Sequence, residues 1–279
     1  MNLGIPPFRL PLILILLSPL VHAQQADSSE PRCSNATVIS VPSRPTVASA
    51  TDTTQCGTVE AEYGLERQWI GGDSGREDLT GGLRFGITPN LDFHWASGDY
   101  LNLTSPETSN HGFGDTWLGL KYRFLSQTKF GPSLGIFYEA KVPSANSKQG
   151  LGSGQVDHSV ALIASKDVSQ VHFDFNAIEL LAGRTIGSGF DHDTGFALAT
   201  WVPVTHRLTA IVELYGYTTL DATSPAFAST MVGISYKVNP RMYLDSGLDL
   251  GTTRYAPNKR VYVGLTCALG NLYSWFSLR

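Results

Sequence analysis

Between Gly57 and Leu269 the chain repeats stretches of about ten to fourteen residues in which apolar and polar residues alternate. Only a β-strand has a side-chain period of two, so each stretch predicts a strand with one apolar and one polar face. The stretches are separated in turn by a very short connection and by a longer polar one. This alternation gathers the tight turns at one end of the sheet and the long loops at the other, as in an outer-membrane β-barrel.

The fourth stretch shows the pattern clearly, because Leu120 and Tyr122 lie on one face and Lys121 and Arg123 on the other. The stretches count to twelve strands, which predicts an all-β, antiparallel, up-and-down transmembrane barrel. Two of the stretches are apolar on both faces, so ten or fourteen strands stay open. An even number brings both chain ends to the side of the tight turns.

The lengths of the connections also predict which way the barrel sits in the membrane. Ser97–Asn110 and Val142–Gly154 are long and polar and are expected outside the cell. Thr88–Asn90 and Val238–Arg241 are tight and are expected in the periplasm.

A secreted double-sheet sandwich is the soluble alternative to this barrel, with its apolar faces meeting inside. Its core would have to hold the large side chains of a dozen long strands, and it would be too wide for side chains to fill. Aromatic residues near strand ends, such as Trp69, Trp95 and Trp201, suit the interfacial girdles of a membrane barrel.

The N-terminus predicts export. Residues 1–23 have a short apolar core and end in Val21-His22-Ala23, which is typical of a cleaved signal peptide; an uncleaved anchor is the alternative. Residues 24–56 have little periodicity and predict an irregular periplasmic lead-in or a small plug. Cys33 and Cys56 bracket this segment and can pair in an oxidising periplasm. Residues 57–270 form the predicted barrel and residues 271–279 a C-terminal tail.

Composition narrows the function classes. Only 16% of the residues are charged and the formal net charge is −4, so the chain has no basic stripe for nucleic acid. The predicted partners are outer-membrane lipid, the barrel-assembly machinery and a small-molecule solute, and no nucleic acid.

One segment resembles a known family. The sequence from Gly112 to Phe124, GFGDTWLGLKYRF, is similar to the G-x-G-D-x-x-L-G-x-K-Y-R-F stretch of the outer-membrane barrels called the phenol-degradation meta-pathway family. Residues 213–216 and 244–251 look like later strands of that family. The resemblance implies passive passage of small molecules, aromatic or hydrophobic ones among them, across a Gram-negative outer membrane. Such barrels usually end on an aromatic residue, whereas this chain continues past Phe276.

An enzyme that acts on lipids is the first alternative function, and Asp157-His158-Ser159 is its best motif. Adjacent residues of a strand point to opposite faces, so His158 and Ser159 cannot meet without a bulge. Residues 191–193, Asp-His-Asp, offer ligands to a metal but lack a fourth ligand in spacing. We therefore expect no enzyme activity, no cofactor and no metal.

The polar faces of the strands carry the candidate site. Charged residues there require water or an opposite charge beside them. They either line a conduit or brace a closed, structural or adhesive barrel, and the sequence leaves both open. Counting back from the connection at residues 126–129 also predicts that Asp115 contacts Lys141. The candidates for lining the lumen are Asp115, Lys121, Arg123, Glu139, Lys141, Glu213, Lys237, Asp245 and Asp249.

Overall fold

The computed structural model describes residues 33, 37–71, 74–97, 99–220, 224–256 and 259–277, and the predicted signal peptide lies outside these residues. Among the described residues, no helix is long and apolar enough to span a membrane. The elements, in chain order, are β1 (Thr58–Gly71), β2 (Ser74–Thr88), β3 (Leu91–Ala96), β4 (Tyr100–Thr104), β5 (Ser109–Phe113), β6 (Thr116–Leu125), β7 (Ser133–Val142), η2 (Ser147–Gln149), β8 (Asp157–Val168), β9 (Val171–Gly183), β10 (Phe190–Pro203), β11 (Leu208–Tyr217), β12 (Phe227–Asn239), β13 (Met242–Gly251), β14 (Lys259–Asn271) and α1 (Leu272–Ser277).

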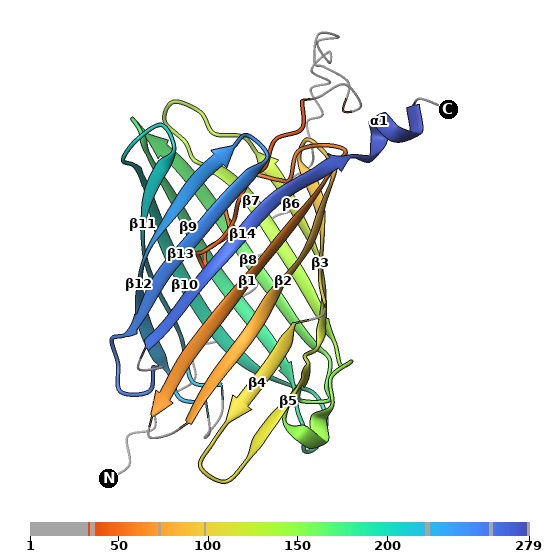
Figure 1. The fold of residues 1–279 in the computed structure, drawn as a ribbon, viewed down its shortest axis with the longest axis vertical. Coiled ribbons are helices and arrows are strands. Elements are labelled where there is room, and N and C mark those ends of the chain that lie inside the picture. The colour runs from red at the N-terminus through yellow and green to blue at the C-terminus, as the bar shows by residue number, and fades with distance from the viewer. Residues whose placement is uncertain are drawn as a thin grey trace, which may run out of the picture. The chain divides into compact units, whose positions relative to one another are not determined.

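All strands belong to one antiparallel sheet, which closes through the pairing of β1 with β14 (Figure 1). Both β3 and β4 pair with β2, so together they make one interrupted strand of the wall. Their neighbours β5 and β6 make the next interrupted strand. The wall therefore has twelve strands, which confirms the predicted barrel.

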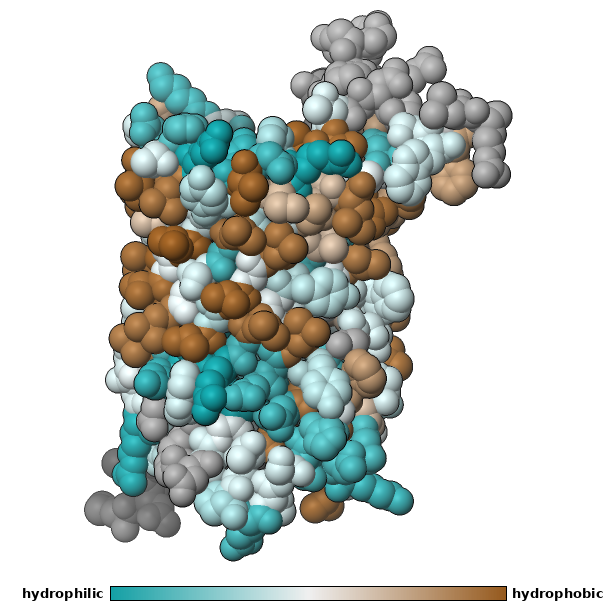
Figure 2. Space-filling model, viewed as in Figure 1, coloured by the Kyte–Doolittle hydropathy of each residue, from teal (hydrophilic) through white to brown (hydrophobic). Residues whose placement is uncertain are grey.

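The barrel reverses the burial pattern of a soluble protein. Leu65, Leu162 and Val263 are 59, 57 and 54% exposed, whereas Asp92 and Glu213 are at most 1% exposed. Figure 2 shows that hydrophobic residues form a belt across the middle of the outer surface, with hydrophilic residues gathered towards both ends. A wall that is apolar outside and polar inside fits lipid around the molecule, so the chain is an outer-membrane barrel and the sandwich is excluded.

The predicted connection Ser97–Asn110 contains strand structure that the alternation did not predict. β4 and β5 form a hairpin around residues 105–108. Here the alternation is inverted, because Leu101 faces the lumen while its neighbour Asn102 faces outwards. The hairpin extends the wall at the long-loop end (Figure 1), and the outer surface towards this end is mostly hydrophilic (Figure 2), so a side chain that points outwards there can be polar.

The predicted aromatic girdle needs a correction as well. Trp95 lies on the outer face and is about half exposed. Trp69 lies between two cations, since the Arg67 guanidinium and the Lys259 ammonium are 5.1 and 4.4 Å from its ring. Trp201, however, points into the lumen and donates a hydrogen bond of 3.0 Å to Asp174. It belongs to the interior, because an indole with a buried acceptor needs no lipid interface.

The turn lengths still predict the orientation, and cysteine labelling tests it. Asn90 and Asn146 are exposed in connections at the two ends of the barrel, and Asn239 is exposed at the end of β12. In a background in which the free Cys267 is replaced by serine, we expect a membrane-impermeant maleimide to label N146C on intact cells and to leave N90C and N239C unlabelled until the cells are lysed. Labelling of N90C or N239C on intact cells, with N146C protected, would place the barrel the other way round.

Candidate functional site

Residues 37–55 fold back into the lumen at the short-turn end as a plug (Figure 1). A disulfide joins Cys33 to Cys56 across a separation of 23 residues and ties the plug to the start of β1. Backbone amides hold the plug against the wall. The Glu213 carboxylate accepts hydrogen bonds from the amides of Val47 (2.9 Å) and Ala48 (2.6 Å). The part of the predicted segment that the structure describes, residues 37–55, therefore contacts the inner wall through these amides.

Further carboxylates of the wall bind other amides of the plug. Glu62 accepts a bond of 2.8 Å from the Ser43 amide, and Asp92 accepts one of 2.7 Å from the Thr54 amide. Hydrogen bonds from backbone amides to buried carboxylates therefore hold the plug at several points between Ser43 and Thr54, and the charge of the carboxylates strengthens them.

Ion pairs cross one side of the lumen. Arg84 forms ion pairs with both Glu60 and Glu62, and its distance to the Glu62 carboxylate is 2.9 Å. Lys121 lies 3.8 Å from Asp92 and donates a bond of 2.6 Å to the carbonyl of Asp52 in the plug. These groups are almost fully buried, so each charge is stabilised by its partner rather than by water.

The loop between β7 and β8 turns inwards at the other end of the lumen. Lys141 lies 3.5 Å from Asp115, forms a second ion pair with Asp157 and donates a bond of 2.7 Å to Ser153. Asp115 in turn accepts a bond of 2.9 Å from the amide of Ala145. The predicted contact of Asp115 with Lys141 is confirmed, and it anchors this loop over the mouth of the barrel.

Apolar and aromatic clusters also line the lumen, beside buried charged residues such as Asp174 and Glu213. Strands β7 to β9 contribute a buried cluster of Phe137, Ala161, Ile163 and Ile178, against which Tyr217 packs. A second cluster joins the plug to β10 and β11, and a third joins β11, β12 and β14. The lining of the lumen thus mixes apolar and charged side chains.

Four cavities follow one another along the lumen. They measure about 460, 420, 190 and 350 Å³ from the long-loop end to the short-turn end. Each cavity shares lining residues with the next. Trp117 lines the first and second cavities, Ala96 and Glu139 line the second and third, and Ser43 lines the third and fourth. The smallest of the four lies beside Arg44 and Arg84, where the plug meets the ion pairs.

The structure places the nine sequence-predicted residues at three levels. Asp115 and Lys141 meet at the long-loop end, and Asp249 pairs with Arg260 at 2.9 Å. Lys121, Glu139, Glu213 and Asp245 lie in the middle of the lumen, the last of these 3.5 Å from Arg44 of the plug. Arg123 reaches the short-turn end, where it bonds Asn90 and Asp52, and Lys237 lies over the ring of Tyr243 at 5.9 Å.

Sequence reasoning missed several residues of the same surface. All of them lie on the polar faces of their strands, and the period of two was the signal that could have found them. They are Glu60, Glu62, Arg84, Asp92, Asp157 and Arg260.

The two motifs considered for chemistry are not assembled into sites. His158 faces outwards and bonds the hydroxyl of Tyr138 at 2.8 Å, while its neighbour Ser159 lines the lumen. Asp191 bonds Arg184, and His192 bonds Glu179. Across the described ranges, no group of three His, Cys, Asp or Glu side chains is arranged to hold a metal ion.

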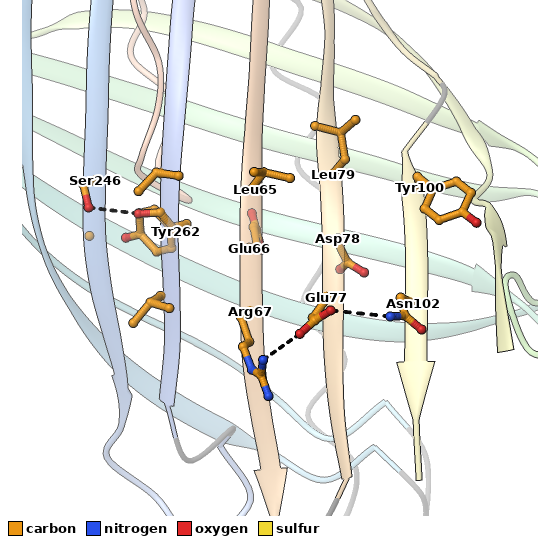
Figure 3. Close-up of a pocket in the computed structure, with 13 residues that line it drawn as sticks. Leu65, Glu66, Arg67, Glu77, Asp78, Leu79, Tyr100, Asn102, Ser246 and Tyr262 are labelled. Atoms are coloured by element: carbon orange, nitrogen blue, oxygen red, sulfur yellow. Dashed lines mark hydrogen bonds and ion pairs between the residues drawn. The ribbon is translucent and has the colours of Figure 1, made fainter. Parts of the chain in front are cut away.

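A further cavity of about 610 Å³ lies on the outer surface and not in the lumen. It spreads over β4, β2, β1, β14 and β13, and its apolar part includes Leu65 and Leu79 (Figure 3). Towards the long-loop end, Glu77 accepts bonds from Arg67 (2.7 Å) and Asn102 (3.4 Å). Because these side chains alternate with those that face the lumen, this groove lies on the outer face and is separate from the four inner cavities. Its apolar part contacts lipid, and its polar end at Glu77 and Asn102 meets water.

Comparison with the solved structure of an outer membrane channel shows the same fold. The COG4313 outer membrane channel from Pseudomonas putida F1 matches with a TM-score of 0.61 and 13% identity, over 78% of this chain and 98% of that one. The NanC porin matches with a TM-score of 0.49 and 10% identity, over 76% of this chain and 100% of that one. No curated protein sequence matches the chain.

The sequence profile of a protein family matches residues 43–267, which include part of the plug and nearly the whole wall. This match agrees with the resemblance seen in the segment from Gly112 to Phe124. The chain belongs to the family described as "Putative MetA-pathway of phenol degradation".

Proposed function

We propose that the protein is an outer-membrane channel for the passive passage of small molecules, aromatic and hydrophobic ones among them. The observation that carries this proposal is the series of four cavities that share lining residues along the lumen. Both apolar or aromatic side chains and charged side chains line this path. A small molecule with a ring and a polar group therefore finds a partner for each of its parts along the path.

The similar structure from Pseudomonas putida F1 is described as a channel, and the family description refers to phenol degradation. Both support a transport role over an enzymatic one. The separation of His158 from Ser159 further supports the proposal that the barrel is not an enzyme.

Solute release from proteoliposomes tests the channel. We expect the protein to release nicotinamide, a small polar aromatic molecule, faster than protein-free liposomes do, without forming any product. A161W should slow this release several-fold, since Ala161 lies in the buried cluster of the lumen wall.

The control is L162W, because Leu162 is the next residue of β8 and faces lipid. It should leave release unchanged. Equal rates for the wild type, A161W and protein-free liposomes would contradict the channel proposal.

A closed structural barrel is the second candidate, because the plug is bonded to several strands and covers the short-turn end of the lumen. In that case the protein would conduct no ions in a planar bilayer.

We also propose that the barrel-assembly machinery recognises the C-terminal part. There β14 continues into α1, whose Trp275 and Phe276 are exposed.

A further inference from the structure

Glu139 lies inside the barrel on β7, where it lines the second of the four cavities. This cavity measures about 420 Å³, and the rest of its lining is mostly apolar and aromatic. The other lining residues are Ala96, Trp117, Ser159, Ile178, Leu180 and Tyr217.

Glu139 has no hydrogen-bond or ion-pair partner among the described residues, unlike the other inward carboxylates discussed above. The neighbouring cations are occupied elsewhere. Lys121 binds Asp92 and the carbonyl of Asp52, and Lys141 binds Asp115 and Asp157. A carboxylate in an apolar cavity without a donor is costly, so the cavity is best completed by a molecule that brings the donor.

We propose that this cavity binds a small aromatic amine. Its ammonium group would donate charge-assisted hydrogen bonds to the Glu139 carboxylate, and its ring would pack on Trp117, Tyr217 and Ile178. The faces of an indole and a phenol also attract a cation, so the lining and the carboxylate favour the same ligand. The inference rests on the proposed channel only in that the amine reaches Glu139 through the lumen.

The charge of the ligand distinguishes an aromatic amine from an aromatic alcohol or an aromatic carboxylate. A neutral phenol or alcohol could bond Glu139 but would leave the carboxylate without a counter-charge. An aromatic carboxylate would be repelled by it. The lining alone would bind all three through their rings, so the contribution of Glu139 is measured as the preference for the amine.

The experiment is equilibrium dialysis of the purified full chain in a nonionic detergent. The probes are phenethylamine, 2-phenylethanol and phenylacetate, which share one ring and differ in the polar group. We expect the wild type to bind phenethylamine about tenfold more tightly than 2-phenylethanol, which is the order of one charge-assisted hydrogen bond. Phenylacetate should bind most weakly.

E139Q should bind the amine and the alcohol about equally. It removes an unpaired charge from the lumen, so it should fold, and the mobility shift of the unheated barrel on a gel checks this. E179Q is the matched control, because Glu179 lies on the outer face of β9 beside His192 and should keep the amine preference.

Equal binding of the amine and the alcohol by the wild type, or an amine preference that persists in E139Q, would overturn the inference. The dialysis needs no transport, so the two proposals fail separately. Amine binding without nicotinamide release would refute the channel and keep the site. Release without any amine preference would refute the site and keep the channel.

Discussion

Removing the plug residues 37–55 is expected to raise the single-channel conductance several-fold in a planar bilayer. The plug lies across the lumen and its backbone occupies the space between Glu213, Glu62 and Asp92. Once it is removed, water replaces the lost amide donors of these carboxylates. The wall keeps all of its strand pairing, because the plug contributes no strand to it.

The double variant C33S/C56S is the companion of this deletion. It keeps the hydrogen bonds of the plug but removes the disulfide that ties the segment to the start of β1. We expect its current to fluctuate between the wild-type level and the high level of the deletion. A plugless barrel with unchanged conductance would show that the plug does not limit the path.

Replacing Lys141 by methionine is expected to lower the free energy of unfolding by about 3 kcal/mol, because breaking a buried ion pair leaves an uncompensated charge. Two carboxylates, Asp115 and Asp157, would be left facing each other without their cation. The loop between β7 and β8 would also lose the bond from Lys141 to Ser153. Reversible urea unfolding in lipid vesicles, followed by tryptophan fluorescence, measures this change.

D115N provides the comparison, because Lys141 keeps its ion pair with Asp157 in that variant. We expect a smaller loss of about 1 kcal/mol, the size of one weakened hydrogen bond, and no change in ion selectivity. Asp115 would then brace the wall. Unchanged stability with an altered cation preference would instead place Asp115 in the conduction path.

The wall could be predicted from sequence because its pattern is local. A side chain in a strand has only two directions, so alternation shows at once which residues face lipid and which face the lumen. The hairpin of β4 and β5 escaped this reasoning. Leu101 and Leu103 face inwards there, and the outward Asn102 meets water towards the long-loop end.

The ion pairs of the lumen were predictable only where two strands are joined directly. Asp115 directly precedes β6, and Lys141 lies on its partner strand β7, so counting from their short connection was enough. The bonds of Glu213 to Val47 and Ala48 were not predictable in this way, because they join residues 166 and 165 positions apart. Such contacts depend on the closure of the barrel and on the path of an irregular segment. The alternation of apolar and polar residues along the strands predicts neither of these.

The attachment of the plug also implies an order of assembly. Its bonds reach Glu60 on β1, 19 residues away, and Glu213 on β11, 166 residues away. The second of these can form only after most of the strands have been brought together. The N-terminal segment, although translated before every strand, must therefore reach its final place among the last parts of the molecule, and a barrel that has just closed passes through a stage with a wider lumen.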